Sequence, residues 1–579
     1  MKNKNIKSYL NISRQWVCYL CLFLFLSDSF SGKAQSYDNR YGWPALKAPK
    51  SLIICSETET QPEAMLLESL SGLAAKAVNE NRFSEMVWMD IDRQNFDESY
   101  GRILEESVKA INIKDFKRMN VWELLTYLKK RGIVKGYVLY TMDDGKGKFD
   151  NSSNVATVYA SLLSGVLIDH SLEAKARQYG LKMLKDATKE SLTECFHKNK
   201  SKLNNATALS IRPSVHNLRD YAIAHKLMLY SDDYKLADEV LAWVKPLTPV
   251  LGWGCGDEYD GTSLVSEWGH FNTASDWCFN LPFISAAAPS VKLEKANELS
   301  LNQINFADTS YVHSFVMSDG DNMQWTMGGF ASSPIYAGNE KAKDTGVTWT
   351  ICPINLSVIS PVSWNEAVKK QSPKNSYIEY GGGYQYPDLF AVKRPNRKEL
   401  LREFARRVNK HMKELDVKIY GALFKDVDSK EAQEALQIYV EEMEDITGII
   451  AIQYFPYELG KQVYWFKNKK GIDIPVVTAD YSIWNEVRTD RPNAGTPEYV
   501  ASLINRDALS NNKYSWTIVH AWSNFEETSN LTPLPSVGMN PVMTSESLLM
   551  KNIRTVSLNE LLWRVRMLHR PEQTKSLMK

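Results

Sequence analysis

Apolar positions in the first part of the chain follow two different periods. Residues 51–55 (SLIIC), 86–89 and 134–140 are short, nearly continuous apolar runs, which are typical of buried strands. Between them, residues 62–79 and 121–130 carry apolar side chains at helical spacing. Strands that alternate with helices predict a parallel α/β layer.

The C-terminal half repeats the same rhythm of strand and then helix. Strands are expected at residues 313–317, 347–352, 417–424, 448–454, 474–478 and 515–520. Helix starts are indicated by capping signals at Asp428 with Glu431, Thr496 before Pro497, and Ser557 with Glu560. Six or more β/α units over about 260 residues predict a TIM-like barrel, which can be distorted. An open doubly wound sheet is the alternative.

The segments between these two regions differ from both. Residues 143–153 (DDGKGKFDNSS) form a turn-rich boundary, after which the pattern is mostly helical to about residue 245, most clearly at 173–189 and 214–230. Residues 251–283 are rich in glycine, tryptophan and acids and have no period. Long irregular segments of this kind are often functional, although a packed interdomain loop is an equal alternative.

We therefore predict an α/β multidomain protein. Its expected parts are a signal peptide (1–34), an N-terminal α/β domain (35–145), a mostly helical middle domain (146–250), an aromatic and glycine-rich segment with a linker (251–300), and a C-terminal β/α barrel domain (301–570).

The N-terminus has the three parts of a signal peptide. Positive charge comes from Lys2, Lys4, Lys7 and Arg14, an apolar run covers 16–26, and small residues stand at 32–34. The apolar run is about half of the roughly 20 residues that a membrane-spanning helix needs. We expect export to the periplasm, cell surface or medium, with no stable membrane insertion after cleavage.

Composition narrows the classes of partner. The net charge is +1 and no long basic run is present, so nothing indicates nucleic acid. Five cysteines would remain after cleavage (Cys55, Cys195, Cys255, Cys278 and Cys352), without the spacing of a disulfide framework or a CxxC site. A Cys255–Cys278 disulfide and buried free thiols both stay open. Abundant tryptophan and tyrosine in polar, glycine-containing stretches favour stacking on sugars, although they also serve ordinary packing.

The residues that follow the expected strands of the C-terminal half carry most of the candidate chemistry, because a barrel forms its active site at that edge. They are Asp319, Asp321, Trp325, Asp426, Asp480, Trp484, His520 and Trp522. Each also has a structural interpretation: Asp319 begins a common turn signal, and Asp480 can accept backbone hydrogen bonds in its loop. Carboxylates repeated at successive strand ends, beside one histidine and aromatic rings, favour a sugar-processing cleft.

The most specific string is GGGYQYP at residues 381–387, preceded by Glu379 and Tyr380. Its glycines permit positive φ and a close approach of the backbone, and Tyr384 and Tyr386 offer rings and hydroxyls. With this string the chain resembles the GxGYxYP family, designated as glycoside hydrolases, and residues 318–325 (SDGDNMQW) resemble a second family element. The resemblance implies N-terminal α/β regions, a C-terminal domain that bears the motif, and a carbohydrate substrate.

Three functions remain open at this point. The first is glycoside hydrolysis without a cofactor or metal, with Asp480 as general acid and Asp321 as base or nucleophile. Asp319 and Asp426 are further catalytic candidates. The expected substrate-binding residues are Trp325, Glu379, Tyr384, Tyr386, Trp484, His520, Trp522, Glu258 and Glu267, of which the three glutamates are also reserves for the catalytic pair.

The second function is metal-dependent deacetylation of a polysaccharide, with a divalent cation held by Asp319, Asp321 and His520. The HxxxH and HExxH signatures are missing from the sequence, which weighs against it. The third is carbohydrate binding without turnover. No GxSxG elbow, P-loop or GxGxxG after a strand is present, so serine esterases, nucleotide hydrolases and dinucleotide oxidoreductases have no support. Sugar, linkage and oligomeric state stay unassigned.

Overall fold

The computed structural model describes residues 40–90, 97–142, 150–319, 322–485, 491–525 and 536–578. The predicted signal peptide and Asp321 lie outside these residues, so export stays a prediction. Residues Gly42–Lys579 form one compact unit, and the elements below belong to it. Within the described ranges, no helix combines the length and the apolar character needed to cross a bilayer.

The first sheet is parallel and has the strand order β2-β1-β3. It contains β1 (Ser51–Cys55), β2 (Glu85–Met89) and β3 (Phe116–Met119), with α2 (Gln61–Asn79), α3 (Asp97–Ala110) and α4 (Val121–Lys130) between and after them. The strands and helices predicted at 51–55, 62–79, 86–89 and 121–130 are confirmed to within a residue. The helix α2 begins where its cap Thr60 accepts a hydrogen bond from the Glu63 backbone N–H.

Two further parallel sheets follow. The order β5-β4-β6 joins β4 (Gly136–Tyr140), β5 (Gly165–Asp169) and β6 (Met183–Asp186), with α5 (Ser152–Leu163), α6 (Glu173–Gln178) and α7 (Leu192–Asn199). The order β10-β9-β7-β8 joins β7 (Ala208–Ser210), β8 (Met228–Tyr230), β9 (Pro249–Leu251) and β10 (Phe271–Thr273), with α8 (Arg219–His225), α9 (Tyr234–Trp243), α10 (Glu258–Glu267) and α11 (Leu281–Ala287).

The two helices expected at 173–189 and 214–230 are shorter than predicted. Each ends at a residue with positive φ, Gly180 in the first case and Lys226 in the second, and a strand follows. A left-handed residue stops the helical hydrogen-bond pattern, and apolar spacing alone does not reveal it. The region after residue 150 is therefore an alternation of helices and short strands, while the domain boundaries stay a prediction.

The C-terminal sheet has 11 strands, all parallel except for the antiparallel pair β16–β17. Its members are β11 (Tyr311–Met317), β12 (Val347–Thr350), β13 (Ser376–Glu379), β14 (Ile419–Phe424), β15 (Gly448–Gln453), β16 (Val463–Lys467), β17 (Asp473–Thr478), β18 (Tyr481–Ile483), β19 (Ala494–Gly495), β20 (Tyr514–Val519) and β21 (Ile553–Thr555). All six predicted strands are confirmed. The order is β16-β17-β15-β14-β13-β12-β11-β20-β18-β19, with β21 beside β11.

This sheet curls into a half-barrel. The chain passes from β17 to β18 through only two residues, Ala479 and Asp480, although β17 pairs with β15 and β18 pairs with β20. The strand pairing does not by itself establish a TIM-like barrel. Apolar side chains of β11, β13, β14, β15 and β20 form one buried cluster, which includes Val316, Ile378, Leu423 and Ile450.

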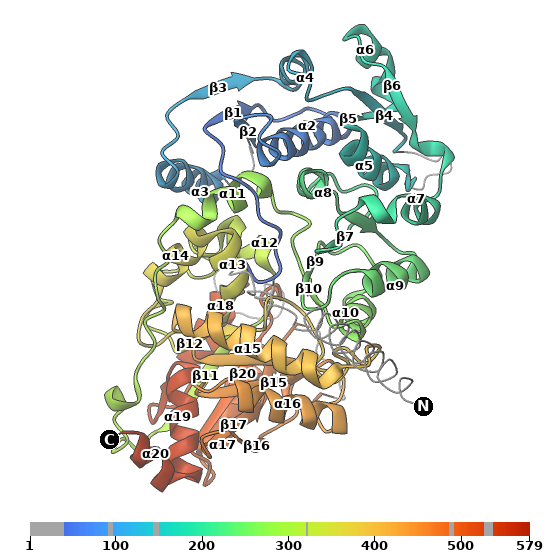
Figure 1. The fold of residues 1–579 in the computed structure, drawn as a ribbon. Helices are drawn as coiled ribbons and strands as arrows, with labels where there is room; N and C mark the ends of the chain where they lie inside the picture. The colour runs from blue at the N-terminus through green and yellow to red at the C-terminus, as the bar shows by residue number, and fades with distance from the viewer. Residues whose placement is uncertain are drawn as a thin grey trace, which may run out of the picture. The chain divides into compact units, whose positions relative to one another are not determined.

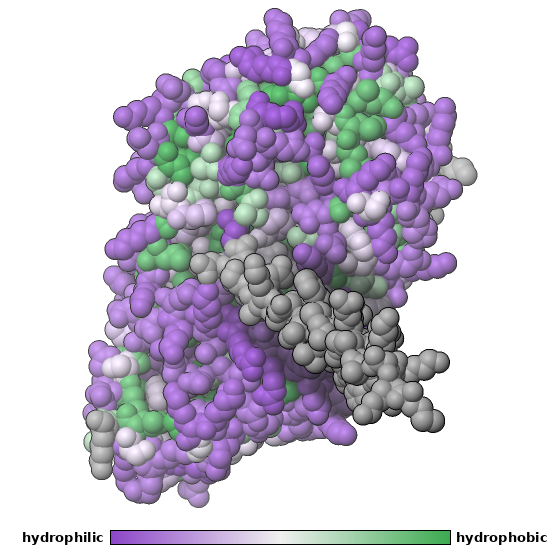
Figure 2. All heavy atoms as spheres, viewed as in Figure 1, coloured by the Kyte–Doolittle hydropathy of each residue, from purple (hydrophilic) through white to green (hydrophobic). Residues whose placement is uncertain are grey.

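Helices accompany this sheet, as Figure 1 shows for α15, α16 and α19. They are α12 (Met323–Trp325), α13 (Pro353–Ile359), α14 (Pro361–Lys370), α15 (Arg397–Leu415), α16 (Lys430–Glu442), α17 (Pro497–Ala508), α18 (Met539–Ser547), α19 (Leu558–His569) and α20 (Pro571–Leu577). Thr496 and Ser557 cap α17 and α19 as predicted, whereas Ser429 and not Asp428 caps α16. The face seen in Figure 2 is largely hydrophilic, because helices such as α15 turn their apolar side inward.

The structure decides between a Cys255–Cys278 disulfide and buried free thiols. Cys55, Cys195, Cys255, Cys278 and Cys352 are all free and buried. Cys255 and Cys278 therefore serve as packed thiols, and burial raises the pKa of Cys255 to about 12.

Candidate active site

A cavity of about 900 Å³ opens beside the loop that follows β11. It is lined by Glu98, Trp253, Glu258, Ala274, Asp276, Trp277, Asp319, Asn322, Gln324, Trp325, Gly328, Gly329, Ser332, Ser333, Pro334, Ile335, Tyr336, Tyr384, His520 and Trp522. These residues come from the irregular segment 251–283, from strand ends of the C-terminal sheet, from the GGGYQYP string and from α3. The cavity thus collects carboxyl groups and aromatic rings from distant parts of the sequence.

Glu258 is the carboxyl group with the most perturbed surroundings in the cavity. It is the first residue of α10, directly after the helix cap Asp257. Its side chain faces the cavity, and no described residue donates a hydrogen bond to it. Burial, followed by the negative charges of Asp319 and Asp257, raises its pKa to about 8. Glu258 is therefore protonated at neutral pH.

Three tyrosines from strand-end loops lie near Glu258. Burial and then the charge of Glu258 raise the pKa of Tyr454 to about 12, and the same two causes raise the pKa of Tyr457 and Tyr386 well above the usual value. The Tyr386 hydroxyl is buried and makes no hydrogen bond within the described part of the chain. A carboxyl group enclosed by rings and without a partner is held in its neutral form.

Asp319 follows β11 and faces the same cavity. Its φ of 66° places it in the left-handed region, where a residue other than glycine stores backbone strain. The Ser318 hydroxyl donates a hydrogen bond to Asp319, and Asp319 Oδ2 lies 3.9 Å from His520 Nε2. The charge of Asp319 also contributes to the raised pKa of Glu258, so the two carboxyl groups interact across the cavity.

His520 is held by a stack of rings. Its imidazole lies 3.8 Å from the Trp484 ring at an angle of 10°, and Trp484 lies 4.9 Å from Tyr457 at 15°. His520 Nδ1 is 2.7 Å from the Ser523 hydroxyl. The stacking on Trp484 and the contact of Nδ1 with Ser523 leave Nε2 as the ring nitrogen that lies near Asp319.

The GGGYQYP string joins the third sheet to the C-terminal sheet. The Tyr384 backbone N–H donates to Asn272 O at 2.8 Å, and the Asn272 N–H donates to Tyr384 O at 2.7 Å. Gly383 has a φ of 150°, and a Cβ on it would lie 2.3 Å from Asn272 O. Only glycine permits this approach, which brings Tyr384 to the cavity wall.

Glu379 holds the GGGYQYP string in place through backbone hydrogen bonds. Its buried carboxylate accepts the backbone N–H groups of Gly382 at 2.7 Å and Ile354 at 2.8 Å. Burial raises its pKa to about 7 although these hydrogen bonds oppose the shift. Glu379 thus shapes the loop and lies outside the residues that line the cavity.

Aromatic rings form much of the remaining wall. Trp253 lies 5.5 Å from Tyr384, and Trp325 lies 5.0 Å from Trp522 with the rings nearly perpendicular. Trp277 and Trp522 expose 59% and 42% of their surface, which leaves ring area for a ligand. Flat apolar faces beside carboxyl groups suit the stacking of sugar rings.

The cavity contains about half of the residues expected to act in it. The residues that line it are Glu258, Asp319, Trp325, Tyr384, His520 and Trp522, and Asp321 lies outside the described residues. Trp484 and Tyr386 stand behind this wall, in contact with His520 and near Glu258 respectively.

Asp480 lies in the interior of the sheet, where it bridges two strands. Its carboxylate accepts the Trp516 backbone N–H at 2.9 Å, and its own N–H donates to Trp516 O at 3.1 Å. Burial raises its pKa to about 7, while the charge of Lys461 opposes the shift. Asp480 therefore links the turn between β17 and β18 to β20 by hydrogen bonds, and it does not line the described cavity wall.

Asp426 and Glu267 also lie away from the described wall of the cavity. Asp426 is exposed and accepts the Asp428 backbone N–H at 3.0 Å, as the first residue of a turn does. Glu267 ends α10 and forms an ion pair with Lys393 at 2.9 Å. Their positions are those of surface and turn residues.

Several residues that line the cavity were not predicted from the sequence. Trp253, Asp276, Trp277, Gln324 and Tyr336 were not among the candidates. Three of them belong to the irregular segment 251–283, whose lack of a period was the available signal. The contact that assembles it is nonlocal: the Trp277 N–H donates to Gln324 Oε1 at 2.6 Å.

No group of three or more histidine, cysteine or acidic side chains suited to a metal ion occurs among the residues that the structure describes. Asp321, the third ligand expected for a metal site, is not one of them. Asp319 and His520, the other two, are adjacent.

Comparison with protein families finds three matching models. They are the GxGYxYP putative glycoside hydrolase C-terminal domain at residues 308–534, the GxGYxYP third domain at 205–286 and the GxGYxYP_N second domain at 134–224. No curated protein matches the chain. A crystal structure of a putative hydrolase from Bacteroides thetaiotaomicron VPI-5482 matches with a TM-score of 0.75 and 20% identity, covering 91% of this chain and 97% of that one. At this identity the likeness concerns the fold.

Proposed function

Because the chain belongs to the GxGYxYP family, we propose that it is a glycoside hydrolase in which Glu258 is the general acid and Asp319 the base or nucleophile. The observation that carries the proposal is the pair of carboxyl groups in one aromatic cavity, one of them neutral at pH 7. Glycosidases generally need two such groups with opposite protonation states. Glu258 replaces Asp480 as the proposed acid.

Glu258 supplies the proton for the leaving group. With a pKa of about 8 it holds this proton at neutral pH, yet it is acidic enough to release it to a glycosidic oxygen as the bond breaks. When the proton leaves, the new carboxylate is unpaired in a desolvated site, which favours its reprotonation in the next step.

Asp319 acts from the strand-end side of the cavity. The Ser318 hydroxyl donates a hydrogen bond to its carboxylate, and His520 Nε2 lies 3.9 Å from its Oδ2. It either activates water or attacks the anomeric carbon, and the separation of the two carboxyl groups in a substrate complex decides between inversion and retention. Asp321, two residues later in the sequence, is the alternative for this role.

The curled sheet fits this assignment. We infer that β17 and β18 act as one bent strand that brings the half-barrel toward a TIM-like barrel, with the cavity at the carboxyl ends of its strands. We also infer that the chain is exported and meets its carbohydrate substrate outside the cytoplasm, which accords with chemistry that uses no ATP or nicotinamide.

A deacetylase is the second candidate, since Asp319 and His520 stand 3.9 Å apart as two ligands of a divalent cation would. The same assay separates both enzymes from a protein that only binds. The mature protein is incubated with a glycan panel, with and without chelator, and reducing ends, acetate and binding are followed. New reducing ends that persist in chelator are expected.

Acetate release that chelator abolishes would replace the hydrolase by the deacetylase, and binding without product would leave a recognition protein. The activities of three variants then show which carboxylate acts together with Glu258: Asp319→Asn, Asp321→Asn and Asp480→Asn. We expect Asp319→Asn to lower kcat by at least about 100-fold. Full activity in that variant, with loss in Asp321→Asn, would transfer the role to Asp321.

A further inference from the structure

The ionisable groups that line the described wall of the cavity are almost all acidic. The carboxyl groups are those of Glu98, Glu258, Asp276 and Asp319, His520 carries the basic side chain, and no lysine or arginine is among the described lining residues. The proposed reaction uses Glu258 and Asp319. Glu98 has a side chain that is 71% exposed and pairs with Arg102 at 2.6 Å. Asp276 therefore remains as a carboxyl group in the cavity without a partner of opposite charge in its wall.

One oxygen of Asp276 has no hydrogen bond. Its Oδ1 is buried and accepts nothing from the described part of the chain. Burial raises the pKa of Asp276, against a hydrogen bond from the Gln324 side chain and the more distant charge of Arg212, which is exposed. A buried carboxylate oxygen without a donor is costly, and a ligand that supplies the donor removes that cost.

Trp277 contributes an exposed ring to the same cavity wall. It directly follows Asp276, it is 59% exposed, and its backbone N–H is held by Gln324 Oε1 at 2.6 Å. An indole face stacks on sugar rings and also attracts cations. Both residues line the cavity, so one ligand can lie against the indole ring and close to the Asp276 carboxylate.

We propose that Asp276 and Trp277 form a subsite for a sugar unit that carries a protonated free amine. An ammonium group provides three donors and a positive charge, whereas a uronic acid or a sulfated unit would bring a negative charge to a wall with no lysine or arginine among its described residues. The inference rests on the proposed function only in that the sugar lies next to the bond acted on by Glu258 and Asp319. It assigns the substrate class as a glycan with unacetylated amino sugars.

Binding of three oligosaccharides tests the subsite. Oligomers of glucosamine, N-acetylglucosamine and glucose, equal in length and linkage, are titrated into the full chain carrying Glu258→Gln, which blocks the proposed turnover. Binding is measured by calorimetry at mildly acidic pH, where the amine is protonated. We expect the glucosamine oligomer to bind at least about tenfold more tightly than the other two. Asp276→Asn should remove this preference and leave the affinity for the glucose oligomer unchanged.

Glu98→Gln is the matched control, because it removes a carboxylate at the rim of the same cavity, and it should keep the preference. Trp277→Ala, at an exposed side chain, should weaken binding of the glucosamine oligomer. Equal affinities for the three oligomers, a preference that survives Asp276→Asn, or unchanged binding in Trp277→Ala would each overturn the subsite. Since binding is measured without turnover, amine-selective binding with no cleavage of any glycan by the wild type would refute the hydrolase and leave the subsite.

Discussion

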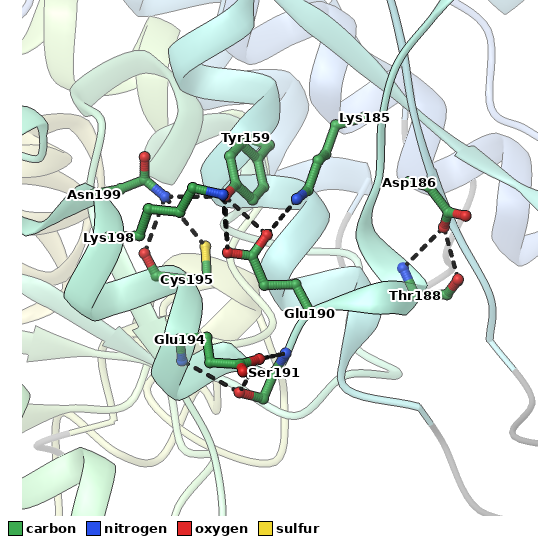
Figure 3. Close-up of polar contacts among 10 residues, drawn as sticks. All are labelled: Tyr159, Lys185, Asp186, Thr188, Glu190, Ser191, Glu194, Cys195, Lys198 and Asn199. Carbon is green, nitrogen blue, oxygen red and sulfur yellow. Dashed lines mark hydrogen bonds and ion pairs between the residues drawn. The ribbon is translucent and has the colours of Figure 1, made fainter.

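Two glutamates show how differently this chain treats the same side chain. Glu190 precedes α7, and the Tyr159 hydroxyl donates to its carboxylate, whose two oxygens lie 3.0 and 2.9 Å from the hydroxyl oxygen (Figure 3). Lys185 also forms an ion pair with Glu190, and Lys198 lies 3.7 Å from it. Burial by itself would raise its pKa, but the hydrogen bonds from Lys185 and Tyr159 outweigh burial and lower it. Glu258, in contrast, has a raised pKa and accepts no hydrogen bond from the described residues.

Under the proposed function, this difference separates carboxyl groups that stabilise the fold from those that act on a ligand. Glu190 ties α5, β6 and α7 together, so its charge contributes to stability. Glu258 is left unsatisfied beside a cavity, which costs stability and is retained where a reaction needs a proton. Replacing one carboxyl group at a time tests whether Glu190 and Glu258 differ in this way.

The largest effect is expected on turnover. Glu258→Gln should lower kcat by about 100-fold or more, because the amide cannot give a proton to the leaving group. Glu190→Gln is the matched control and should retain full activity after purification at low temperature. Initial rates of reducing-end release measure the activity of both variants. Comparable activity in the two would contradict a catalytic role that Glu258 has and Glu190 lacks.

The next effect is on the pH profile. Glu258 must be protonated to act, so kcat/KM of the wild type should decline by about tenfold per pH unit above pH 8, where its pKa of about 8 is passed. Rates measured from pH 6 to 10 on a neutral oligosaccharide test this. A decline that begins near pH 5 would exclude Glu258 as the acid.

For the free energy of unfolding, Glu190 and not Glu258 should be the residue whose replacement causes a loss. Glu190→Gln removes a charged acceptor from Tyr159 and Lys185 and should lower the free energy of unfolding by about 1–3 kcal/mol. Urea unfolding, with hydrogen exchange of α5 and β6, locates the loss. Glu194→Gln, at the exposed capping box of α7, is the control and should cost less. A larger loss in the control would show that the cap outweighs the Glu190 cluster.

The smallest effect is the pH dependence of stability. The folded pKa of Glu258 is raised, so folding takes up a proton between the unfolded value near 4.5 and about pH 8. Wild-type stability therefore falls across this window, and Glu258→Gln should gain in melting temperature relative to wild type as pH rises.

The pKa of Glu190 is lowered, and the sign is reversed for its variant. The stabilisation by Glu190 is complete above the unfolded pKa and is lost as pH falls through the folded pKa. The deficit of Glu190→Gln should therefore shrink on acidification below about pH 4.5. Parallel curves for the two variants would contradict the opposite pKa directions.

Local patterns predicted the elements of this fold well. The strands at β1, β11 and β20 and the caps at Thr496 and Ser557 follow from apolar runs and from hydrogen bonds made within a few residues. The short strands after α6 and α8 escaped prediction, because a left-handed residue within a helical apolar pattern has no periodic signature.

The sequence predicted the residue types of the candidate site, acids and aromatic rings, but only some of the residues that form it. Asp480 was expected to be the acid because Tyr481 and Trp484 make its setting apolar, and its pKa is indeed raised. Its hydrogen bond to the Trp516 backbone turns it into the sheet, a direction that no neighbour in sequence reveals. Glu258 and Asp276 depend on contacts with residues more than 40 positions away.

The sequence alone thus determined the α/β order, most strand positions, the GGGYQYP string and the prediction of carbohydrate chemistry, since each depends on side chains within one element or one turn. Only the tertiary structure decided which carboxyl groups face the cavity. Burial and the approach of Asp319 raise the pKa of Glu258, and the pairing of Tyr384 with Asn272 joins the third sheet to the C-terminal one. Desolvation and charge are properties of a three-dimensional environment, and the chain creates that environment only when distant segments meet.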